Sequence, residues 1–298
     1  MNGGAALRSM RLRTLPLSLA GIVLGVLLAA SEQQVRPLTV LLLALTTVCL
    51  QILSNLSNEL GDTLSGTDRS DRQGIRYSLQ DGLMSIRDMK RLIGCFAALS
   101  CVLGFGMVWS AFGTVFAPLP LAFLVLGAAA VWSAMHYTLG KRPYGYRGLG
   151  DVFVFIFFGL ATVCGAYFLC GLHWSWSILL PAAAIGCFSV AVLNVNNIRD
   201  MKSDAATRVT VAMKMGERRA RIYQTCLIAA GWLLMMLFCL TCGKLSPWRF
   251  AYLLSLPGFI LHLRGVWTRR DRELDPMLPL LVLSTFVFAL LGGIGALL

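Results

Sequence analysis

Nine long apolar segments dominate this sequence and limit what it can fold into. They are residues 15–30, 38–58, 92–112, 119–139, 152–171, 176–196, 220–242, 248–265 and 277–297. Each is close to the roughly 20 apolar residues that a helix needs to cross a bilayer. With 57% hydrophobic and 13% charged residues, the chain has more apolar surface than a soluble domain of this length can bury. The sequence therefore predicts one all-α integral-membrane domain, residues 1–298.

The charged residues fall almost entirely on one side of the predicted membrane. A net charge of +12 could indicate nucleic-acid binding, but in a membrane protein the sorting of Lys and Arg between loops is tested first. The amino-terminal arm and the segments after the even-numbered spans carry 23 of the 26 Lys and Arg residues. This bias predicts a cytoplasmic amino terminus, an external carboxyl terminus and no nucleic-acid partner. The same face holds 13 of the 14 Asp and Glu residues, which orientation alone does not explain.

Two acidic motifs with the same Asn-x-x-x-Asp spacing follow the second and sixth predicted spans, within residues 55–68 and 194–204. Residues four apart lie on one face of a helix, so each motif gathers its oxygen atoms on one side if the helix continues. Their polar side chains are Asn58, Asp62, Asp68, Asn196, Asp200 and Asp204. The repeated spacing indicates a weak internal repeat.

The predicted topology places both motifs at helix carboxyl ends, where carboxylates are unfavourable. The helix dipole is negative there and disfavours each carboxylate by about 0.3–1 kcal/mol. A divalent cation reverses this effect, and ligands that are all oxygen favour Mg²⁺, which often shares its coordination with a substrate phosphate. A solvated loop with capping aspartates would explain one motif alone, but two matching motifs favour a metal site.

Basic residues accompany the acidic motifs and could bind a phosphate. Arginine offers a planar fork for phosphate oxygens, and lysine offers a point charge. The candidates are Arg13, Arg72, Arg76, Lys141 and Arg208. Each could instead anchor the chain at the membrane surface, although the interleaving of Arg76, Lys141 and Arg208 with the acidic motifs favours a functional role.

Several stretches resemble the UbiA superfamily of intramembrane aromatic prenyltransferases, over nearly the whole chain. The two acidic motifs resemble that superfamily's two Asp-rich motifs. Within the superfamily, the first motif and following loop of one branch are similar to SNLSNELGDTLSGTD, DRQG and IRYSLQDGLMS, and its opening segment is similar to MRLRTLPLSLAGIVLG. KRPYGYRGLGDVFVFIFFGLATVCGAYFL and NNIRDMKSD with VTVAMKMG narrow the resemblance to its 1,4-dihydroxy-2-naphthoate polyprenyltransferase branch, of menaquinone biosynthesis. Glu59 stands where Asp is more usual, and Thr207-Arg208 stands where Gly-Lys is more usual.

The resemblance implies a bundle of nine transmembrane helices around a central cavity with a cytoplasmic cap, in a bacterial cytoplasmic (inner) membrane. It also implies Mg²⁺-assisted ionisation of a polyprenyl diphosphate, with two ions, and prenylation of the naphthoate with loss of its carboxylate, giving demethylmenaquinone. The implied metal ligands are Asn58, Asp62, Asp68, Asn196, Asp200 and Asp204, of which the four aspartates are catalytic. Candidates for binding the aromatic acceptor are Asn55, Tyr137, Tyr146, Arg147 and Asp151. The active site would face the cytoplasm.

Other functions stay open on the sequence alone. The acceptor could be 4-hydroxybenzoate, homogentisate or a haem, against which the YRGLGD stretch argues by resemblance. A cation-coupled transporter, with the acids coordinating a translocated cation, is another alternative, although coupling sites usually lie near the membrane midplane and these motifs lie at one face. A structural membrane protein is a third alternative, but it leaves the paired motifs unexplained. Prenyl chain length, the proton acceptor and the oligomeric state cannot be predicted.

Overall fold

The computed structural model describes residues 3–66, 77–205, 207–241 and 246–298, and this part of the chain is helical, with no β-strand. Nine of its helical stretches are long and apolar enough to cross a membrane. The predicted all-α membrane bundle is therefore confirmed. The elements are α1 (Gly3–Met10), η1 (Leu12–Thr14), α2 (Leu15–Glu32), α3 (Pro37–Ser65), α4 (Ile86–Phe112), α5 (Pro118–His136), η2 (Tyr144–Arg147), α6 (Gly150–Val154), η3 (Phe155–Ala161), α7 (Thr162–Gly171), η4 (Trp176–Ile178), α8 (Leu179–Arg199), α9 (Met201–Asp204), α10 (Val211–Met215), α11 (Glu217–Thr241), η5 (Pro247–Ser255), α12 (Leu256–Thr268), η6 (Asp271–Leu274) and α13 (Met277–Leu297).

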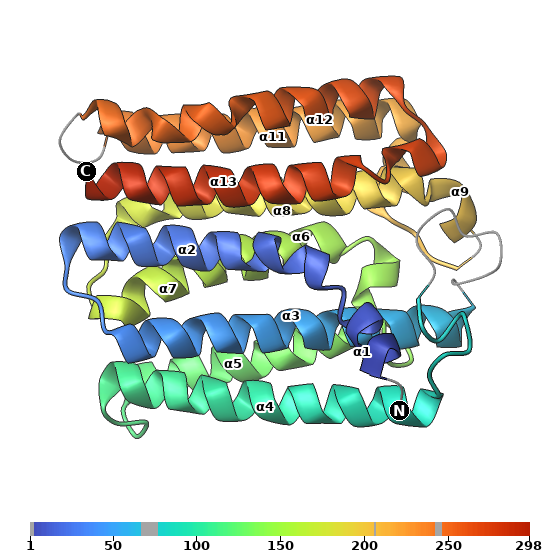
Figure 1. Ribbon diagram of the computed structural model, residues 1–298, viewed down its shortest axis with the longest axis horizontal. Helices are drawn as coiled ribbons and strands as arrows, with labels where there is room; N and C mark the ends of the chain where they lie inside the picture. The colour runs from blue at the N-terminus through green and yellow to red at the C-terminus, as the bar shows by residue number, and fades with distance from the viewer. Residues whose placement is uncertain (1–2, 67–76, 206, 242–245) are drawn as a thin grey trace.

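The long helices run side by side, roughly along the longest axis of the molecule (Figure 1). α3 packs on α4 and α5, α2 on α13 and α7, and α8 on α11. The last turns of α3 and α8 lie at the same end of the bundle, together with α1 and α9, and the carboxyl terminus lies at the opposite end (Figure 1). The two acidic motifs are thus brought to one end of the bundle, as their topology predicts.

Helices α3 and α8 extend beyond the predicted spans, through the acidic motifs. α3 continues to Ser65 and ends at Gly66, whose φ of 71° is in the left-handed region that glycine adopts at helix ends. α8 continues to Arg199 and is followed by Asp200, with φ −93° and ψ 5°, before the short helix α9 begins. The first motif is therefore helical over Asn58 and Asp62, whereas the second motif crosses a break at Asp200.

One half of the bundle, made of α8 and α11 to α13, has a densely packed aromatic core. Its side chains are Phe188, Trp232, Tyr252, Phe259 and Phe288, with ring centroids 4.7 to 6.1 Å apart. Contacts of this kind add to the apolar area that each ring buries. Spans α4 and α5 in the other half are only 17% and 11% buried over their apolar windows. α4 and α5 therefore lie at the periphery of the bundle, with most of their residues outside its core.

A close approach fixes the end of α3 against the loop that follows α5. A Cβ atom at Gly61 would lie 2.5 Å from the Cβ of Thr138, so that only glycine fits there without a shift. The Thr138 hydroxyl donates a hydrogen bond of 2.9 Å to the carbonyl oxygen of Ser57. This packing holds the first acidic motif beside residues 137–147.

Candidate active site

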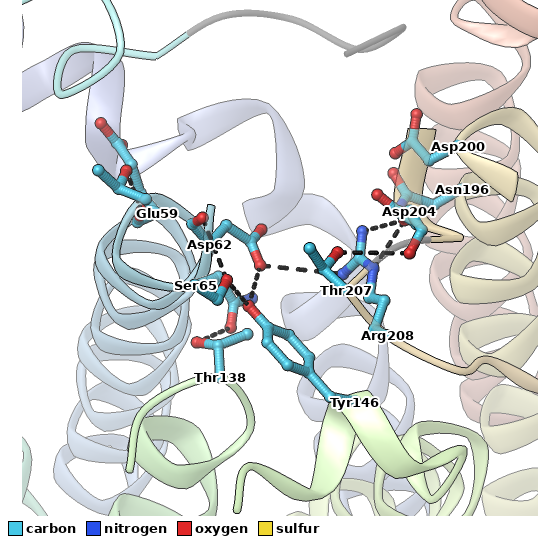
Figure 2. Close-up of polar contacts among 12 residues, drawn as sticks. Glu59, Asp62, Ser65, Thr138, Tyr146, Asn196, Asp200, Asp204, Thr207 and Arg208 are labelled. Atoms are coloured by element: carbon cyan, nitrogen blue, oxygen red, sulfur yellow. Dashed lines mark hydrogen bonds and ion pairs between the residues drawn. The ribbon is translucent and has the colours of Figure 1, made fainter. Parts of the chain in front are cut away.

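The first acidic motif points its carboxylate at a tyrosine from the loop after α5. The hydroxyl of Tyr146, in η2, donates a 2.7 Å hydrogen bond to Asp62 Oδ1 and lies 2.9 Å from the hydroxyl of Ser65 (Figure 2). Asp62 is buried. Thr138 also lies 3.3 Å from the amide oxygen of Asn58. The side chains of this motif are thus held in place by η2 and the adjoining loop.

The second acidic motif lies at the same end of the bundle as the first, at the break between α8 and α9. Asp200 and Asp204 have no solvent-exposed surface. The backbone N–H of Asp200 still bonds to the carbonyl oxygen of Asn196, and that of Asp204 bonds to the carbonyl oxygen of Asp200. The break therefore keeps the four-residue spacing while it turns the chain, so that both carboxylates stay inside the protein.

Arg208 joins the two motifs. Its Nε donates a 2.7 Å hydrogen bond to Asp204 Oδ2, its Nη2 pairs with the same carboxylate, and its Nη1 lies 3.9 Å from Asp62 Oδ1 (Figure 2). Burial alone lowers the pKa of this guanidinium, but the negative charges of Asp62 and Asp204 outweigh burial and raise the pKa above its ordinary value. Arg208 is therefore a permanent cation between carboxylates that are far apart in the sequence.

A second arginine, Arg199, which the sequence did not single out, binds the other carboxylate of the second motif. Its Nε and Nη2 donate to Asp200 at 2.8 and 2.6 Å. Nη2 also donates to Asn196 Oδ1 at 2.8 Å, and Nη1 donates to Asp275 at 2.7 Å. Arg199 was visible inside the motif, between Asn196 and Asp200, but nothing in the sequence identified Asp275 as its partner.

A cavity of about 570 Å³ opens from this charged end into the bundle. Its polar wall includes Asn58, Asp62, Asn196, Arg199 and Arg208. The rest of its wall is mainly apolar and is formed by α2, α3, α4, α5, α7 and α8 and the adjoining π-helical turn η3. A molecule with an anionic head and a long apolar tail matches this division of charge.

The sequence matches the UbiA prenyltransferase family over residues 18–284. The chain belongs to this family. It is 39% identical over 274 residues to the 1,4-dihydroxy-2-naphthoate octaprenyltransferase of Escherichia coli K12, covering 92% of this chain and 87% of the relative. It is 34% identical over 294 residues to the enzyme of the same name from Haemophilus influenzae, covering 96% and 94%.

Solved UbiA structures share the fold of this chain. A UbiA homolog from Aeropyrum pernix K1 superposes with a TM-score of 0.69 at 17% identity, covering 94% of this chain and 96% of the other. A homolog from Archaeoglobus fulgidus, solved bound to GPP and Mg²⁺, gives a TM-score of 0.69 at 18% identity, covering 98% and 99%. The nine-helix UbiA architecture predicted by resemblance is therefore confirmed.

Other residues expected to bind the diphosphate lie in several places. Arg13 lines the cavity and donates a 3.0 Å hydrogen bond to the hydroxyl of Tyr77. Arg11, which the sequence reasoning missed, also lines the cavity and stacks on the Tyr77 ring with its Cζ atom 3.7 Å from the centroid. Lys141 is exposed. Asp68, Arg72 and Arg76 lie outside the described residues.

The acceptor candidates divide in the same way. Asn55 and Tyr137 line the cavity, although the Asn55 amide also donates to the carbonyl oxygen of Met10 at 2.9 Å and thereby holds the end of α1 against α3. Burial raises the pKa of Tyr137 well above its ordinary value, so its phenol stays protonated. Tyr146 contacts Asp62, as described above. The other candidates lie apart from the cavity wall that the described residues form: Arg147 is exposed, and Asp151 accepts a 3.1 Å hydrogen bond from Tyr223.

The oxygen donors at the charged end fit Mg²⁺ in kind. Amide and carboxylate oxygens from Asn58, Asp62 and Asn196 face one cavity, with Asp200 and Asp204 directly behind it, and such hard ligands suit this ion. Across the described residues, no three Asp, Glu, His or Cys side chains converge closely enough to hold a metal as they stand. Guanidinium groups neutralise the carboxylates in this arrangement, so metal binding requires some of these ion pairs to rearrange.

Proposed function

We propose that this chain transfers a polyprenyl group from a polyprenyl diphosphate to 1,4-dihydroxy-2-naphthoate, with loss of the carboxylate as CO₂, giving the hydroquinone demethylmenaquinol. Demethylmenaquinone, the product that the resemblance implied, forms from this hydroquinone by a separate two-electron oxidation. The observation that carries the proposal is the meeting of Asp62, Arg208 and Asp204 at the polar end of an apolar cavity. Ionisation of a prenyl diphosphate requires charged groups beside a space that excludes water. The names of the relatives in E. coli and H. influenzae supply the naphthoate acceptor and an octaprenyl donor.

Two Mg²⁺ ions complete the proposed site. Their ligands are Asn58, Asp62, Asp68, Asn196, Asp200 and Asp204. When bound, the ions neutralise the departing diphosphate and so speed cleavage of its bond to the prenyl carbon. Support comes from the donor set described above and from the homolog of A. fulgidus solved with GPP and Mg²⁺.

The side chains of the protein perform the remaining tasks. Arg208 and Arg13, both on the cavity wall, bind diphosphate oxygens and hold the leaving group at the charged end. The apolar wall excludes water, which would otherwise react with the allylic carbocation. The protonated phenol of Tyr137 donates a hydrogen bond to an oxygen of the naphthoate and orients the ring for attack.

The prenyl tail extends beyond the cavity into lipid. A volume of about 570 Å³ lies within the range of about 300–1,000 Å³ that holds a drug-sized ligand, so it fits the acceptor and the first isoprene units. Phe105 on α4 and Leu126 on α5 line the cavity and are 47% and 38% exposed. The opening between α4 and α5 is the proposed exit. The proposal places the charged end at the cytoplasmic face, because the loops at this end carry most of the Lys and Arg residues.

Purified protein in lipid nanodiscs tests the proposal directly. With octaprenyl diphosphate and 1,4-dihydroxy-2-naphthoate, it should release pyrophosphate, CO₂ and the prenylated product, and EDTA should stop all three. Asp62→Asn and Asp200→Asn should abolish turnover. Unchanged turnover in EDTA would exclude the metal site.

Parallel reactions with 4-hydroxybenzoate, homogentisate and haem test the acceptor. Only 1,4-dihydroxy-2-naphthoate should give product at a substantial rate. A faster reaction with any other acceptor, with the naphthoate inert, would place the enzyme in another branch of the family.

A further inference from the structure

Arginines cover the two carboxylates of the second acidic motif on the side that faces the cavity. Asp200 and Asp204 have no exposed surface. Arg199 pairs with Asp200 and Arg208 pairs with Asp204, and these two arginines line the cavity. A cation that enters from the cavity therefore meets a guanidinium before it reaches either carboxylate.

Metal binding at Asp200 requires Arg199 to change partners. The guanidinium donates to both carboxylate oxygens, with Nε on Oδ1 and Nη2 on Oδ2, so a metal ion that approaches from the cavity competes with it for the same two oxygen atoms. The side chain of Arg199 is 5% exposed. A buried cation that loses its partner is strongly unfavourable unless another anion takes its place.

Asp275 is that other anion. It follows η6, outside both acidic motifs, and already accepts a 2.7 Å hydrogen bond from Arg199 Nη1. Its side chain is 33% exposed, and it lines the same cavity. Arg199 can therefore turn from Asp200 towards Asp275 without losing all of its charge pairing.

We propose that Asp275 is a positioning residue, which holds Arg199 when a divalent cation takes Asp200. The inference rests on the proposed function, because it assumes that Asp200 is a metal ligand. Asp275 acts through Arg199 and does not itself bind the metal. Without Asp275, Arg199 should have Asp200 as its only carboxylate partner and should bind Asp200 more tightly. Metal binding at Asp200 should therefore weaken.

The same connection between α12 and α13 offers a matched control. Asp271 forms a 2.9 Å ion pair with Lys202, which links η6 to α9. The ion pair of Asp275 with Arg199 links the end of η6 to α8 in a similar way. The side chains of Asp271 and Lys202 are 40% and 72% exposed, and their ion pair does not involve Asp200. Asp271 has a φ of 48°, a conformation that asparagine tolerates, so Asp271→Asn removes one charge from the same loop without adding backbone strain.

The test measures the binding of Mn²⁺ alone to the protein in nanodiscs. Electron paramagnetic resonance reports the concentration of the free ion. Asp275→Asn should weaken Mn²⁺ binding about tenfold, the effect of one charge-assisted hydrogen bond. Asp275→Glu should restore it in part, and Asp271→Asn should bind as the wild type does. Arg199→Gln should bind Mn²⁺ at least as tightly as the wild type, because the competitor for Asp200 is gone.

The double variant Arg199→Gln, Asp275→Asn decides between an indirect and a direct role. If Asp275 acts through Arg199, adding Asp275→Asn to Arg199→Gln should change Mn²⁺ affinity by less than twofold. A further tenfold loss would overturn the inference, because Asp275 would then act on the metal directly. Equal affinity of Asp275→Asn and wild type would also overturn it. Wild-type protein that does not bind Mn²⁺ would instead refute the proposed metal site.

Discussion

Replacing Arg208 by glutamine should strongly destabilise the metal-free protein. The change leaves the buried carboxylates Asp62 and Asp204 without the cation that lies between them. Removing one partner of a buried ion pair costs about 3–5 kcal/mol. At about 2 °C per kcal/mol, the low end of the usual range because the chain has 298 residues, the melting temperature should fall by about 6–10 °C.

Thermal unfolding in detergent, followed by intrinsic fluorescence, measures this effect. Millimolar Mg²⁺ should recover most of the loss in Arg208→Gln, because the ion replaces the guanidinium charge between the carboxylates. The same variant should stay inactive, since the diphosphate loses one of its two proposed arginines. Arg218→Gln, at an exposed position near the start of α11, is the control and should melt as the wild type does. The reasoning is refuted if Arg208→Gln melts within about 2 °C of the wild type without metal.

Three further predictions concern the surroundings of the site. Tyr146→Phe removes the hydrogen bond to the Asp62 carboxylate, which contributes about 1.5–3 kcal/mol, so steady-state kinetics should show kcat/KM at least about tenfold lower; an unchanged value would remove Tyr146 from the site. Gly61→Ala inserts a Cβ 2.5 Å from Thr138, in the loop after α5, and should lower the free energy of unfolding by about 1–3 kcal/mol. Gly94→Ala, with open space around it, should not lower it; equal effects of the two changes in thermal unfolding would contradict the close packing. Burial raises the pKa of Tyr144 to about 12, so folding favours the neutral phenol, and stability should fall as the pH rises from about 10, where the unfolded phenol ionises, towards 12. Tyr144→Phe should flatten this part of the profile of melting temperature against pH. An identical profile in the variant and the wild type would refute the prediction.

Hydrophobic length and charge sorting were enough to predict the membrane bundle. Nine apolar segments predicted the nine candidate spans found among the described residues, because in lipid a helix is a structure that satisfies its own backbone hydrogen bonds. Predicted span ends were less accurate where polar residues continued a helix. α3 runs to Ser65, since Asn58 and Asp62 interrupt the apolar pattern without breaking the helix.

The gathering of the two motifs at one end of the bundle was also predictable, but their ion pairs were not. Helix direction placed Asp62 and Asp204 at the same membrane face, whereas the position of Arg208 between them depends on how the segment after α9 folds back. One partner of Arg199 is Asp275, which lies 76 residues later in the sequence. No local spacing encodes such a contact.

The uneven packing of the bundle separates two kinds of evolutionary change. The second acidic motif is carried by α8, which belongs to the aromatic-packed half, whereas the proposed exit for the tail lies between α4 and α5, the two least buried spans of the described residues. Substitutions on α4 and α5 can therefore alter the length or branching of the accepted tail while the ionising chemistry is inherited unchanged. Within this architecture, donor preference can diversify faster than the reaction itself.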